Sequence, residues 1–551
     1  MNNIATISIL LLSSFLLSAQ ESSLPKTSVA FTTSDSALQK LYDRAEALAV
    51  ENIIYYGDRK VLKEGAVYDN VWLETQPMGG YMYAKRNMTV AKNNIEIFMD
   101  YQRADGRLPG VIYNRGIIIP SYNQFQGLYF AMPAFEMYYL LGRDTTYLNR
   151  VYKSLKSFDE YLWKTRDSDN NGCLETWCIF DTGEDHSIRF NEFPNGWVYE
   201  FHPTKEFAAN LTKEELKINC SENEYNTAIE MKVPIESMEI MSYSYSCRHV
   251  LSLISKELNN GEEKFWREMA EEVRANLKSY LWDDVKNACF DKDKDNKTMP
   301  ILLHNNLRCM HLGSFDQDMA DRFIAHHLMN PEEFWTPMPL PSIAANDPSF
   351  RNISGNNWSG QPQGLTYQRS IRALENYGHF AELTSLGLKF LDVLEDSLKF
   401  TQQFEPFTAT INNSKDGYGP SILTTLEFIG RFYGIHITQD KIFWSCLDDS
   451  HDYEYSQEWN GTKYKLKTKG NEVVCLKNDK HLFTFSKGVR VVTDLDCNLI
   501  EVVGISTQPT LIQYKVQKEY SLYVEPNIIY RLNGKGKFEK YKSYNYTEPI
   551  N

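Results

Sequence analysis

Hydrophobic residues recur at helical spacing along most of this chain. The spacing of three or four residues places them on one face of a helix, as in the stripe Leu148, Val151, Leu155, Phe158 and Leu162. The same pattern predicts ten helices, over residues 36–52, 81–102, 128–141, 146–164, 237–258, 262–281, 317–329, 364–377, 381–400 and 422–433. This many helices, joined by long aromatic loops, fits a ring of helical hairpins whose loops carry function.

After Ile435 the pattern changes to short β-rich runs separated by turn residues. The runs are 463–466, 472–476, 481–485, 488–492, 498–503, 510–514 and 528–532. Their spacing predicts an all-β module, most simply a sandwich. We therefore expect a mainly α protein, with a helical domain over residues 30–437 and a small C-terminal β-sandwich over residues 438–551.

The first twenty residues predict a secretory signal peptide. The apolar stretch 7–17 leads into the small-residue segment Ser18-Ala19-Gln20 and is too short for a membrane span. We expect a secreted or periplasmic protein that has no membrane span. The nine cysteines form no C-x-x-C pair, which argues against a zinc ribbon or a thioredoxin-like site.

Charge and aromatic content narrow the function. The 551 residues include 58 Lys and Arg and 72 Asp and Glu, a net charge of −14, which argues against a nucleic-acid partner because phosphates need a basic face. Aromatic residues make up 13% of the chain. Flat rings stack on sugars, although a large core is aromatic too.

The segment DSDNNGCLETWCIFDTGEDHSIR, residues 167–189, is the richest in chemical groups. It places Asp181, Glu184, Asp185, His186 and Arg189 within nine positions, next to Trp177. A carboxyl in an apolar, like-charged setting has a raised pKa, which suits a general acid. The alternative is a solvated acidic loop.

The start of that segment also resembles a calcium loop. Asp167, Asp169 and Asn171 alternate ahead of Gly172, but the twelfth position is Cys178 where an EF-hand has a bidentate Glu. Glu175 is a substitute ligand, and a tight Asx-rich turn is the alternative. We expect no cofactor; a structural calcium ion at Asp167, Asp169 and Asn171 is the one metal site that the sequence suggests as an alternative. The chain has no H-E-x-x-H, G-x-S-x-G or Walker A motif and predicts no other cofactor.

Three further loops pair aromatic rings with polar groups ahead of, or after, a predicted helix. They are YDNVWLETQPMGG with Trp72 and Glu74, NNWSGQPQGL with Trp358, Gln361 and Gln363, and QQFEPFT with Gln402 and Glu405. A Trp can stack on a sugar while amides and carboxylates bind hydroxyl groups. The alternative is that these loops are packed turns or helix caps.

Taken in order, these segments resemble the (α/α)6-barrel glycosidases, in particular the family that holds processing α-glucosidase and mannosylglycerate hydrolase and is related to trehalases and glucoamylases. The resemblance covers about residues 35–435 through DSDNNGCLETW, TGEDHSIRF, PLPSIAANDPSF, NNWSGQPQGLTYQRSIRALENYG, QFEPFT and DGYGPSILTTLEFI. It implies an (α/α)6 toroid for the helical domain. It places Asp185 at the general acid and Arg189 at the motif's arginine. Glu184 replaces a residue that is often apolar, so it shares or takes that role.

The resemblance breaks down at two points. The family's W-R-G-P-x-W segment falls on residues 358–363, where the Arg and the second Trp are lost, which puts the sugar specificity in doubt. The family's E-x-Y-x-P carries the base four residues before the proline, and counting back from Pro406 gives Gln402, an amide. Glu405 is our first choice for the base, with Glu74, Glu236 and Glu239 as alternatives. The family inverts, with two carboxyl groups about 6.5–9.5 Å apart.

We therefore expect a secreted, exo-acting glycoside hydrolase that acts on an oligosaccharide or polysaccharide. Asp185, helped or replaced by Glu184, is the acid, and Glu405 is the base. The expected substrate-binding residues are Trp72, Glu74, Trp177, Arg189, Glu236, Trp358, Gln361, Gln363 and Gln402. The alternatives are a catalytically altered glycan-binding relative, favoured by Gln402, and a polysaccharide lyase on an α/α toroid.

Overall fold

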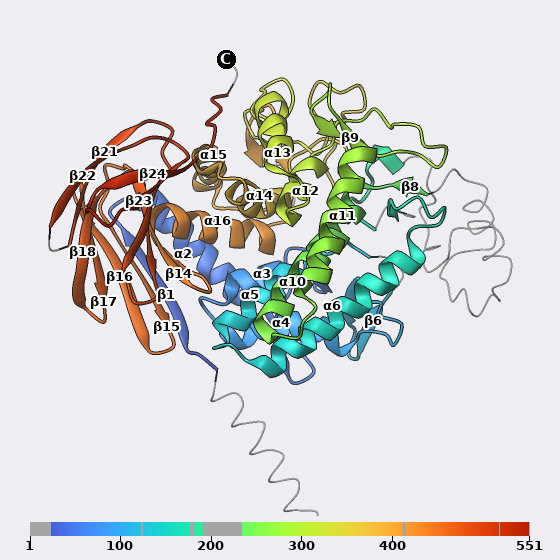
Figure 1. The fold of residues 1–551 in the computed structure, drawn as a ribbon, viewed down its shortest axis with the longest axis horizontal. Helices are drawn as coiled ribbons and strands as arrows, with labels where there is room; N and C mark the ends of the chain where they lie inside the picture. The colour runs from blue at the N-terminus through green and yellow to red at the C-terminus, as the bar shows by residue number, and fades with distance from the viewer. Residues whose placement is uncertain are drawn as a thin grey trace, which may run out of the picture.

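The computed structural model describes residues 24–122, 125–176, 181–190, 234–411, 415–516 and 518–549. The predicted signal peptide, residues 1–20, and Trp177 lie outside the described residues. Figure 1 shows a helical body beside a β-rich region, with the helices running from blue to orange along the chain and the strands mostly in red.

The described residues contain twelve α-helices and a C-terminal β-rich region. The helices are α2 (Ser36–Glu51), α3 (Gln76–Tyr83), α4 (Met88–Asp100), α5 (Ala131–Leu140), α6 (Thr145–Thr165), α10 (Met238–Leu258), α11 (Glu263–Leu281), α12 (Asn305–Leu312), α13 (Gln317–Phe323), α14 (Gly364–Asn376), α15 (Phe380–Ser397) and α16 (Gly419–Tyr433).

Two helix predictions need correction. The single helix expected over residues 81–102 is two helices, because the Asn87 side chain accepts a hydrogen bond from Val90 N at 3.1 Å and starts α4 as a new helix. Sequence analysis also missed α12, whose eight residues are all buried. A helix that is buried on every side shows no alternation of apolar and polar positions.

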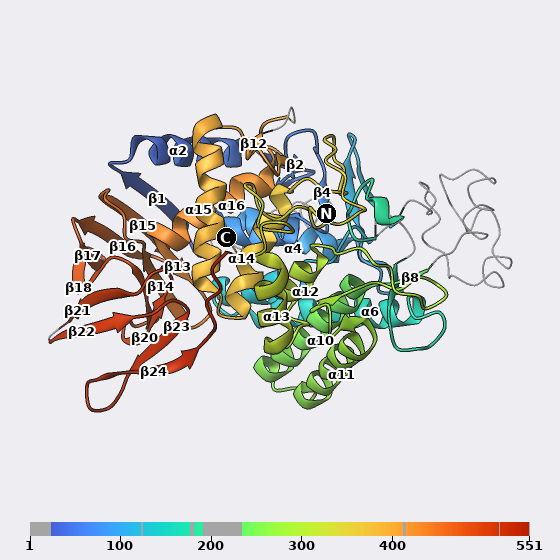
Figure 2. The same cartoon turned by 90° about the horizontal axis from the view of Figure 1, so that it is seen from above.

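Six helices form a closed circuit of contacts: α3 contacts α5, α5 contacts α10, α10 contacts α12, α12 contacts α14, α14 contacts α16, and α16 returns to α3. The other helices flank this circuit. For example, α4 contacts α3, α11 contacts α10, and α15 contacts α14 and α16. The view from above in Figure 2 shows α2, α15 and α16 between the β-rich region and the remaining helices.

Residue patterns explain which helices lie inside. In α16 every residue from Gly419 to Tyr433 is buried, whereas α11 buries a single stripe that runs from Trp266 through Ala270, Val273 and Leu277 to Leu281. A helix that is covered all round belongs to the interior, and an amphipathic helix covers the outside. The interior helices still carry charged residues, which must therefore pair with one another.

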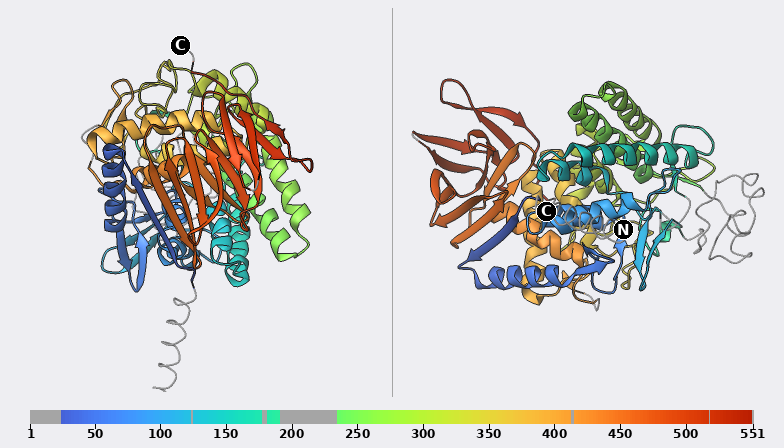
Figure 3. Two further views of the ribbon diagram at one scale, coloured as in Figure 1. Left: turned by 90° about the vertical axis from the view of Figure 1, so that its left-hand side faces the viewer. Right: turned by 90° about the horizontal axis from the view of Figure 1, so that it is seen from below.

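The C-terminal region is built from two antiparallel sheets, shown from their outer side in Figure 3 (left). Trp444 is fully buried between them, and its ring lies 6.0 Å from Tyr464 and 5.5 Å from Phe483 of the facing sheet. The seven-stranded sheet contains β1 (Thr27–Thr33), β15 (Tyr453–Trp459), β16 (Thr462–Lys469), β17 (Glu472–Lys477), β18 (Lys480–Ser486), β21 (Thr510–Lys515) and β22 (Glu519–Val524). The six-stranded sheet contains β13 (Ile435–Ile437), β14 (Lys441–Cys446), β19 (Val489–Asp494), β20 (Leu499–Gly504), β23 (Ile528–Leu532) and β24 (Phe538–Ser543).

Strand β1 comes from the N-terminal side of the helical domain and pairs along its whole length with β15, from Thr27 opposite Trp459 to Thr33 opposite Tyr453. The sandwich therefore includes residues that the predicted boundary at residue 30 assigns in part to the helices. Strand β13, residues 435–437, likewise belongs to the sandwich although the predicted boundary at residue 437 assigns it to the helical domain. Between β15 and β16, Asn460 and Gly461 both have positive φ, 49° and 75°, as a tight two-residue hairpin turn requires.

Short strands lie within the loops of the helical domain. They are β2 (Ile53–Tyr56) with β3 (Arg59–Leu62), β4 (Val71–Trp72) with β5 (Val111–Asn114) and β6 (Ile118–Ser121), β7 (Glu175–Thr176) with β8 (Ile235–Glu236), β9 (Trp282–Asp283) with β10 (Ala288–Cys289), and β11 (Phe404–Glu405) with β12 (Thr410–Ile411). Strands β4, β7 and β11 lie in three of the loops that the sequence predicts to be functional.

None of the seven cysteines that the structure describes is paired in a disulfide. Within the same described ranges, no helix combines the length and the apolar character needed to cross a lipid bilayer.

Candidate active site

A cavity of about 310 Å³ lies among the loops that precede the interior helices. Glu64, Trp72 and Glu74 lead into α3, Gln126 precedes α5, and Trp358 precedes α14. The complete lining is Glu64, Tyr68, Trp72, Glu74, Gln126, Gly183, Asp185, Asn356, Trp358, Gln402 and Tyr418.

The two carboxyl oxygens of Asp185 differ in their hydrogen bonding. Its Oδ2 accepts a hydrogen bond from Asn356 Nδ2 at 2.7 Å, and its Oδ1 has no hydrogen-bond partner among the described residues. Burial raises the pKa of Asp185 to about 6, against the opposing effect of the Asn356 hydrogen bond. Asp185 is therefore largely protonated in mildly acidic solution and has an oxygen free to deliver that proton.

A chain of amides continues from Asp185 across the cavity. Asn356 Oδ1 accepts a hydrogen bond from Gln402 Nε2 at 2.6 Å, and Gln402 Oε1 accepts one from the Tyr68 hydroxyl at 2.8 Å. Gln402 thus reaches the cavity as predicted, but its amide is fixed as a hydrogen-bonding bridge. It cannot take a proton from water at neutral pH.

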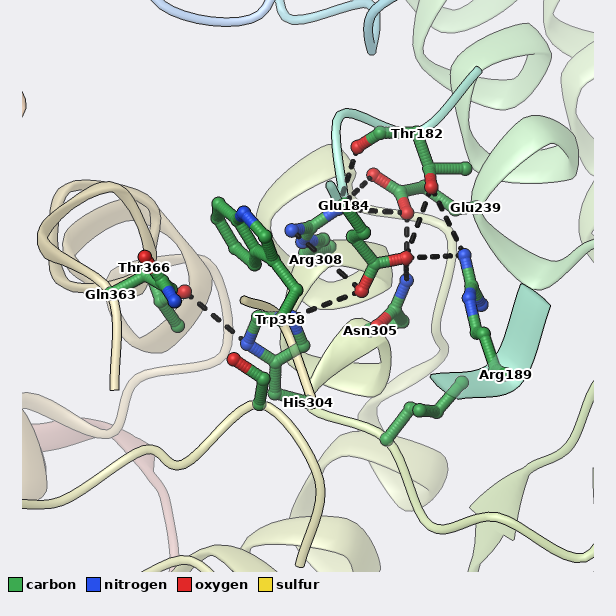
Figure 4. Close-up of polar contacts among 12 residues, drawn as sticks. Thr182, Glu184, Arg189, Glu239, His304, Asn305, Arg308, Trp358, Gln363 and Thr366 are labelled. Atoms are coloured by element: carbon green, nitrogen blue, oxygen red, sulfur yellow. Dashed lines mark hydrogen bonds and ion pairs between the residues drawn. The ribbon is translucent and has the colours of Figure 1, made fainter. Parts of the chain in front are cut away.

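Glu184 has a different environment from its neighbour Asp185. Figure 4 shows it among Arg189, Arg308, His304, Asn305 and Thr182. It forms an ion pair with Arg189, and its carboxylate lies 3.9 Å from Arg308, 3.4 Å from His304 Nε2 and 3.2 Å from Asn305 Nδ2. Burial acts to raise the pKa of Glu184, but the two guanidiniums and His304 hold it well below the usual value. Glu184 stays ionised and cannot serve as a proton donor.

The ion pairs extend beyond Glu184 to the interior helices. Arg189 Nη1 also binds Asp291 at 2.6 Å, and Arg308 of α12 binds Glu239 of α10 at 2.9 Å. The Arg308 guanidinium lies over the Trp358 ring, 5.0 Å from its centroid. The network therefore anchors both the Asp185 loop and the aromatic ring in the cavity wall. Arg189 supports this wall and does not line the cavity.

Glu74 lies directly against the Asp185 loop. Gly183 has a φ of 70°, and a Cβ at this position would overlap Glu74 Oε2. The Glu74 carboxylate is 3.3 Å from Arg369 and 3.4 Å from Gln126 Nε2. Burial raises the pKa of Glu74 to about 8, with Arg369 lowering it and Asp185 raising it. Only a glycine at position 183 lets the main chain approach this carboxylate so closely.

The structure does not bring Glu405, our first choice for the base, to this cavity. Its carboxylate caps its own hairpin, accepting hydrogen bonds from Phe407 N at 2.8 Å, from Thr408 N at 2.5 Å and from Asn352 Nδ2 at 2.6 Å. Burial acts to raise the pKa of Glu405, but these hydrogen bonds hold it below the usual value. A turn of only four residues, 406–409, explains the placement, because it folds the chain back onto the Glu405 side chain.

Of the remaining predicted residues, some line the cavity and others stabilise a loop beside it. Trp72 and Trp358 line the cavity as predicted. Gln361 and Gln363 instead stabilise the loop that carries Trp358: Gln361 donates to Asn352 Oδ1 at 2.8 Å, and Gln363 donates to the carbonyl of Asn357 at 3.3 Å.

Glu236 lies away from the cavity in a separate acidic cluster. The carboxylate oxygens of Asp169, Glu175 and Glu236 all lie within 4.8 Å of one another. Asn171 Nδ2 donates to Glu236 Oε1 at 2.8 Å, while Asp167 Oδ1 accepts from Gly172 N at 3.4 Å. The calcium-like loop therefore meets Glu236, which the sequence had suggested as a sugar ligand.

Sequence analysis missed Glu64 and Gln126 in the cavity wall. A usable signal existed for Gln126, because Q-F-Q-G-L before α5 repeats the Q-P-Q-G-L that precedes α14. Glu64 stands in K-E-G, a carboxylate before a glycine turn at the start of the same loop that holds Trp72.

Residues 80–419, more than half of the chain, match the family model described as the mannosylglycerate hydrolase MGH1-like glycoside hydrolase domain. The chain belongs to this glycoside hydrolase family. It is therefore a glycoside hydrolase. No curated protein is similar enough in sequence to count as a match.

Solved structures agree on the fold. The mannosylglycerate hydrolase of Thermus thermophilus in complex with glucose is 16% identical, with a TM-score of 0.55 over 70% of this chain and 99% of that one. The same enzyme in complex with Tris and D-glycerate is 17% identical, with a TM-score of 0.54 over 70% and 99%. A structure described as a sialidase is 13% identical, with a TM-score of 0.61 over 84% of this chain and 41% of that one.

The buried ion network around Glu184 should stabilise the folded state of this glycoside hydrolase. Glu184→Gln should lower the free energy of unfolding by roughly 3–5 kcal/mol, because it removes a buried carboxylate from two guanidiniums. Urea unfolding followed by circular dichroism measures the loss. The matched control is Glu263→Gln, whose 3.2 Å pair with Arg267 is exposed and should contribute about 0–1 kcal/mol. Equal losses in the two variants would contradict the network's role.

Proposed function

We propose that this glycoside hydrolase is an exo-acting, inverting enzyme built on an (α/α)6 toroid. The closed circuit of six interior helices, with outer helices against several of them, supports the toroid. The convergence of eleven lining residues on one cavity supports the removal of single sugars from a chain end, since an endo-acting enzyme needs an open groove.

The observation that carries the proposal is Asp185 itself. Its free Oδ1 and its pKa raised to about 6 are the properties of a general acid that protonates a leaving glycosidic oxygen. Trp72 and Trp358 supply rings that can stack on the sugar, and Glu74, Gln126 and Gln402 supply hydrogen-bonding groups for its hydroxyls.

A glycan-binding protein without catalysis, the alternative raised by Gln402, is less well supported. A binding site does not need a carboxyl with a raised pKa and an unpaired oxygen, because burying such a group without a partner costs free energy.

Asp185→Asn should lower kcat by about 10²–10⁴-fold on 4-nitrophenyl glycosides, because it removes the proton donor without changing its shape. The loss should be smaller on 2,4-dinitrophenyl glycosides, whose leaving group needs little protonation. Release of the nitrophenols measures both rates across α- and β-glycosides of glucose, mannose and galactose. Full activity of Asp185→Asn on the 4-nitrophenyl substrates would rule out Asp185 as the acid.

The pH profile offers a second test of the acid. Asp185 acts in its protonated form, so kcat/KM should fall as pH rises through its pKa of about 6. Asn356→Ala removes the hydrogen bond that stabilises the ionised carboxylate, so the pKa of Asp185 should rise and the alkaline limb should move to higher pH. The control is Asn352→Ala, because Asn352 donates to Glu405 instead. An alkaline limb unmoved by Asn356→Ala would show that another group sets it.

We also propose that the cluster of Asp169, Glu175 and Glu236 binds a structural calcium ion. Glu175 and Glu236 stand directly opposite each other in the β7–β8 pair, where two like charges are destabilising. Glu236 is 3% exposed, and its Oε2 has no hydrogen-bond partner among the described residues. Burial, with a smaller contribution from the charges of Asp169 and Asp167, raises the pKa of Glu236 to about 7, against the hydrogen bond from Asn171. The donor set consists of oxygens alone, which suits Ca²⁺, and the ion would neutralise the cluster.

Calcium chloride added to chelator-treated protein should raise the melting temperature, and magnesium chloride should raise it less. Glu236→Gln should remove the calcium-dependent shift, and the exposed Glu268→Gln should keep it. Terbium luminescence provides a direct binding signal with the same two variants. A wild-type protein with neither a calcium-dependent shift nor a terbium signal would contradict the site.

A further inference from the structure

Three of the residues that line the cavity carry carboxyl groups: Asp185, Glu64 and Glu74. An inverting hydrolase needs two carboxyl groups, one to protonate the leaving oxygen and one to activate water. With Asp185 as the acid, the second role falls to Glu64 or Glu74. This inference rests on the function proposed above and asks which of the two takes the proton from water.

Glu74 is poorly placed to be that base. It is held by Arg369 and Gln126, and the main chain at Gly183 covers its Oε2. Gly183 is only two residues from Asp185, so Glu74, which precedes α3, lies against the loop that carries the acid. These contacts suit a carboxylate that binds sugar hydroxyls in a fixed orientation.

Glu64 shares the cavity wall with Tyr68, the residue at which the hydrogen-bonded chain from Asp185 ends. Its neighbours are Tyr418, whose hydroxyl hydrogen-bonds to its carboxylate, and Tyr68, whose hydroxyl donates to Gln402. The two tyrosine rings meet edge to face with their centroids 6.2 Å apart. Glu64 therefore lines the same cavity as Asp185, near enough for the charge of Asp185 to act on its pKa.

Main-chain contacts fix Glu64 in this position. Gly65 pairs with Tyr418 in an isolated bridge, and Gly419 N donates to the Glu64 carbonyl at 2.6 Å. A Cβ at Gly65 would overlap the Gly417 carbonyl, and one at Gly419 would overlap the Glu64 carbonyl. The loop before α3 is thus clamped against the start of α16. A side chain held this firmly is preorganised for catalysis.

We propose that Glu64 is the general base of this glycoside hydrolase. Its carboxylate takes a proton from a water molecule whose oxygen bonds to the anomeric carbon. The bond from that carbon to the glycosidic oxygen breaks, its electron pair stays on the leaving oxygen, and Asp185 gives that oxygen its proton. The products are a sugar of inverted anomeric configuration and a free alcohol. Glu64 ends protonated and Asp185 ionised, and exchange with solvent restores both.

Electrostatic coupling links the protonation states of Asp185, the proposed acid, and Glu64, the proposed base. Burial raises the pKa of Glu64 well above its usual value, and the charges of Glu74 and Asp185 raise it further, while the Tyr418 hydrogen bond lowers it. When Asp185 holds its proton, one of those negative neighbours is neutral, which favours the ionised form of Glu64. The coupling disfavours the state in which both groups are ionised, and the productive state is the singly protonated one in which Asp185 holds the proton.

The test compares Glu64→Gln, Glu64→Ala, Glu74→Gln and Glu74→Ala on the 2,4-dinitrophenyl glycoside that the wild type cleaves best. Glu64→Gln should lose about 10²–10⁴-fold in kcat, because a good leaving group does not replace a base. Sodium azide should restore turnover of Glu64→Ala and yield a glycosyl azide of inverted configuration, identified by proton NMR. Rescue also shows that the variant is folded. Glu74→Gln should mainly raise KM and should not respond to azide.

The matched control is Glu405→Gln, which removes a carboxylate outside the cavity and should keep wild-type kcat. Wild-type kcat in Glu64→Gln, or azide rescue of Glu74→Ala in place of Glu64→Ala, would overturn the assignment of Glu64 alone. A wild-type protein that cleaves none of the aryl glycosides would overturn the proposed function together with this inference. Turnover with retention of configuration would overturn the base role, because a retaining enzyme uses its second carboxylate as a nucleophile.

Discussion

Two buried guanidiniums, Arg189 and Arg308, are the constraint on which the site depends. Each is almost fully removed from water and must have carboxylate partners, since an unpaired buried charge costs several kcal/mol. Glu184 lies near both, while Asp291 and Glu239 complete their coordination. The pairing of Glu184 with these charges therefore holds the segment of residues 181–190, which places the next residue, Asp185, at the cavity.

This constraint explains how two adjacent carboxyl groups acquire opposite properties. Glu184 meets two cations, so its pKa is held low, whereas Asp185 meets an amide, so burial dominates and its pKa rises. The peptide bond between them separates a structural anion from a proton donor. Environment assigns the roles, as it does wherever neighbouring carboxyls have different pKa values.

Periodicity predicted the outer helices well and the interior ones less well. The stripe of Leu148 to Leu162 identifies α6 almost to its ends, because one face of that helix meets the core. By contrast, α12 reads N-N-L-R-C-M-H-L, and Arg308, Asn305 and His311 are buried in the protein. An interior helix that carries the ion network has many polar residues. The hydrophobic pattern therefore does not predict α12, although it is buried and belongs to the site.

The candidate site was predicted to the extent that its residues share a local segment. Trp72 with Glu74, Trp358 with Asn356, and Asp185 with Gly183 are neighbours in sequence, and their loops all reach the cavity. The β-hairpin of Glu405 shows the limit of this reasoning, since a turn decides on which side of the chain a single carboxylate lies. Nothing in residues 402–408 alone shows that Glu405 hydrogen-bonds to its own turn.

The closure of the helix circuit accounts for Glu64. Contact between α16 and α3 brings the loop before the first interior helix against the loop before the last, so residues 64 and 418 meet although most of the domain separates them in sequence. At such a closure, a chemical group supplied by one loop can equally be supplied by the other. A glutamine at position 402 therefore does not deprive the cavity of a second carboxylate, because Glu64 reaches the same wall from the opposite end of the helical domain.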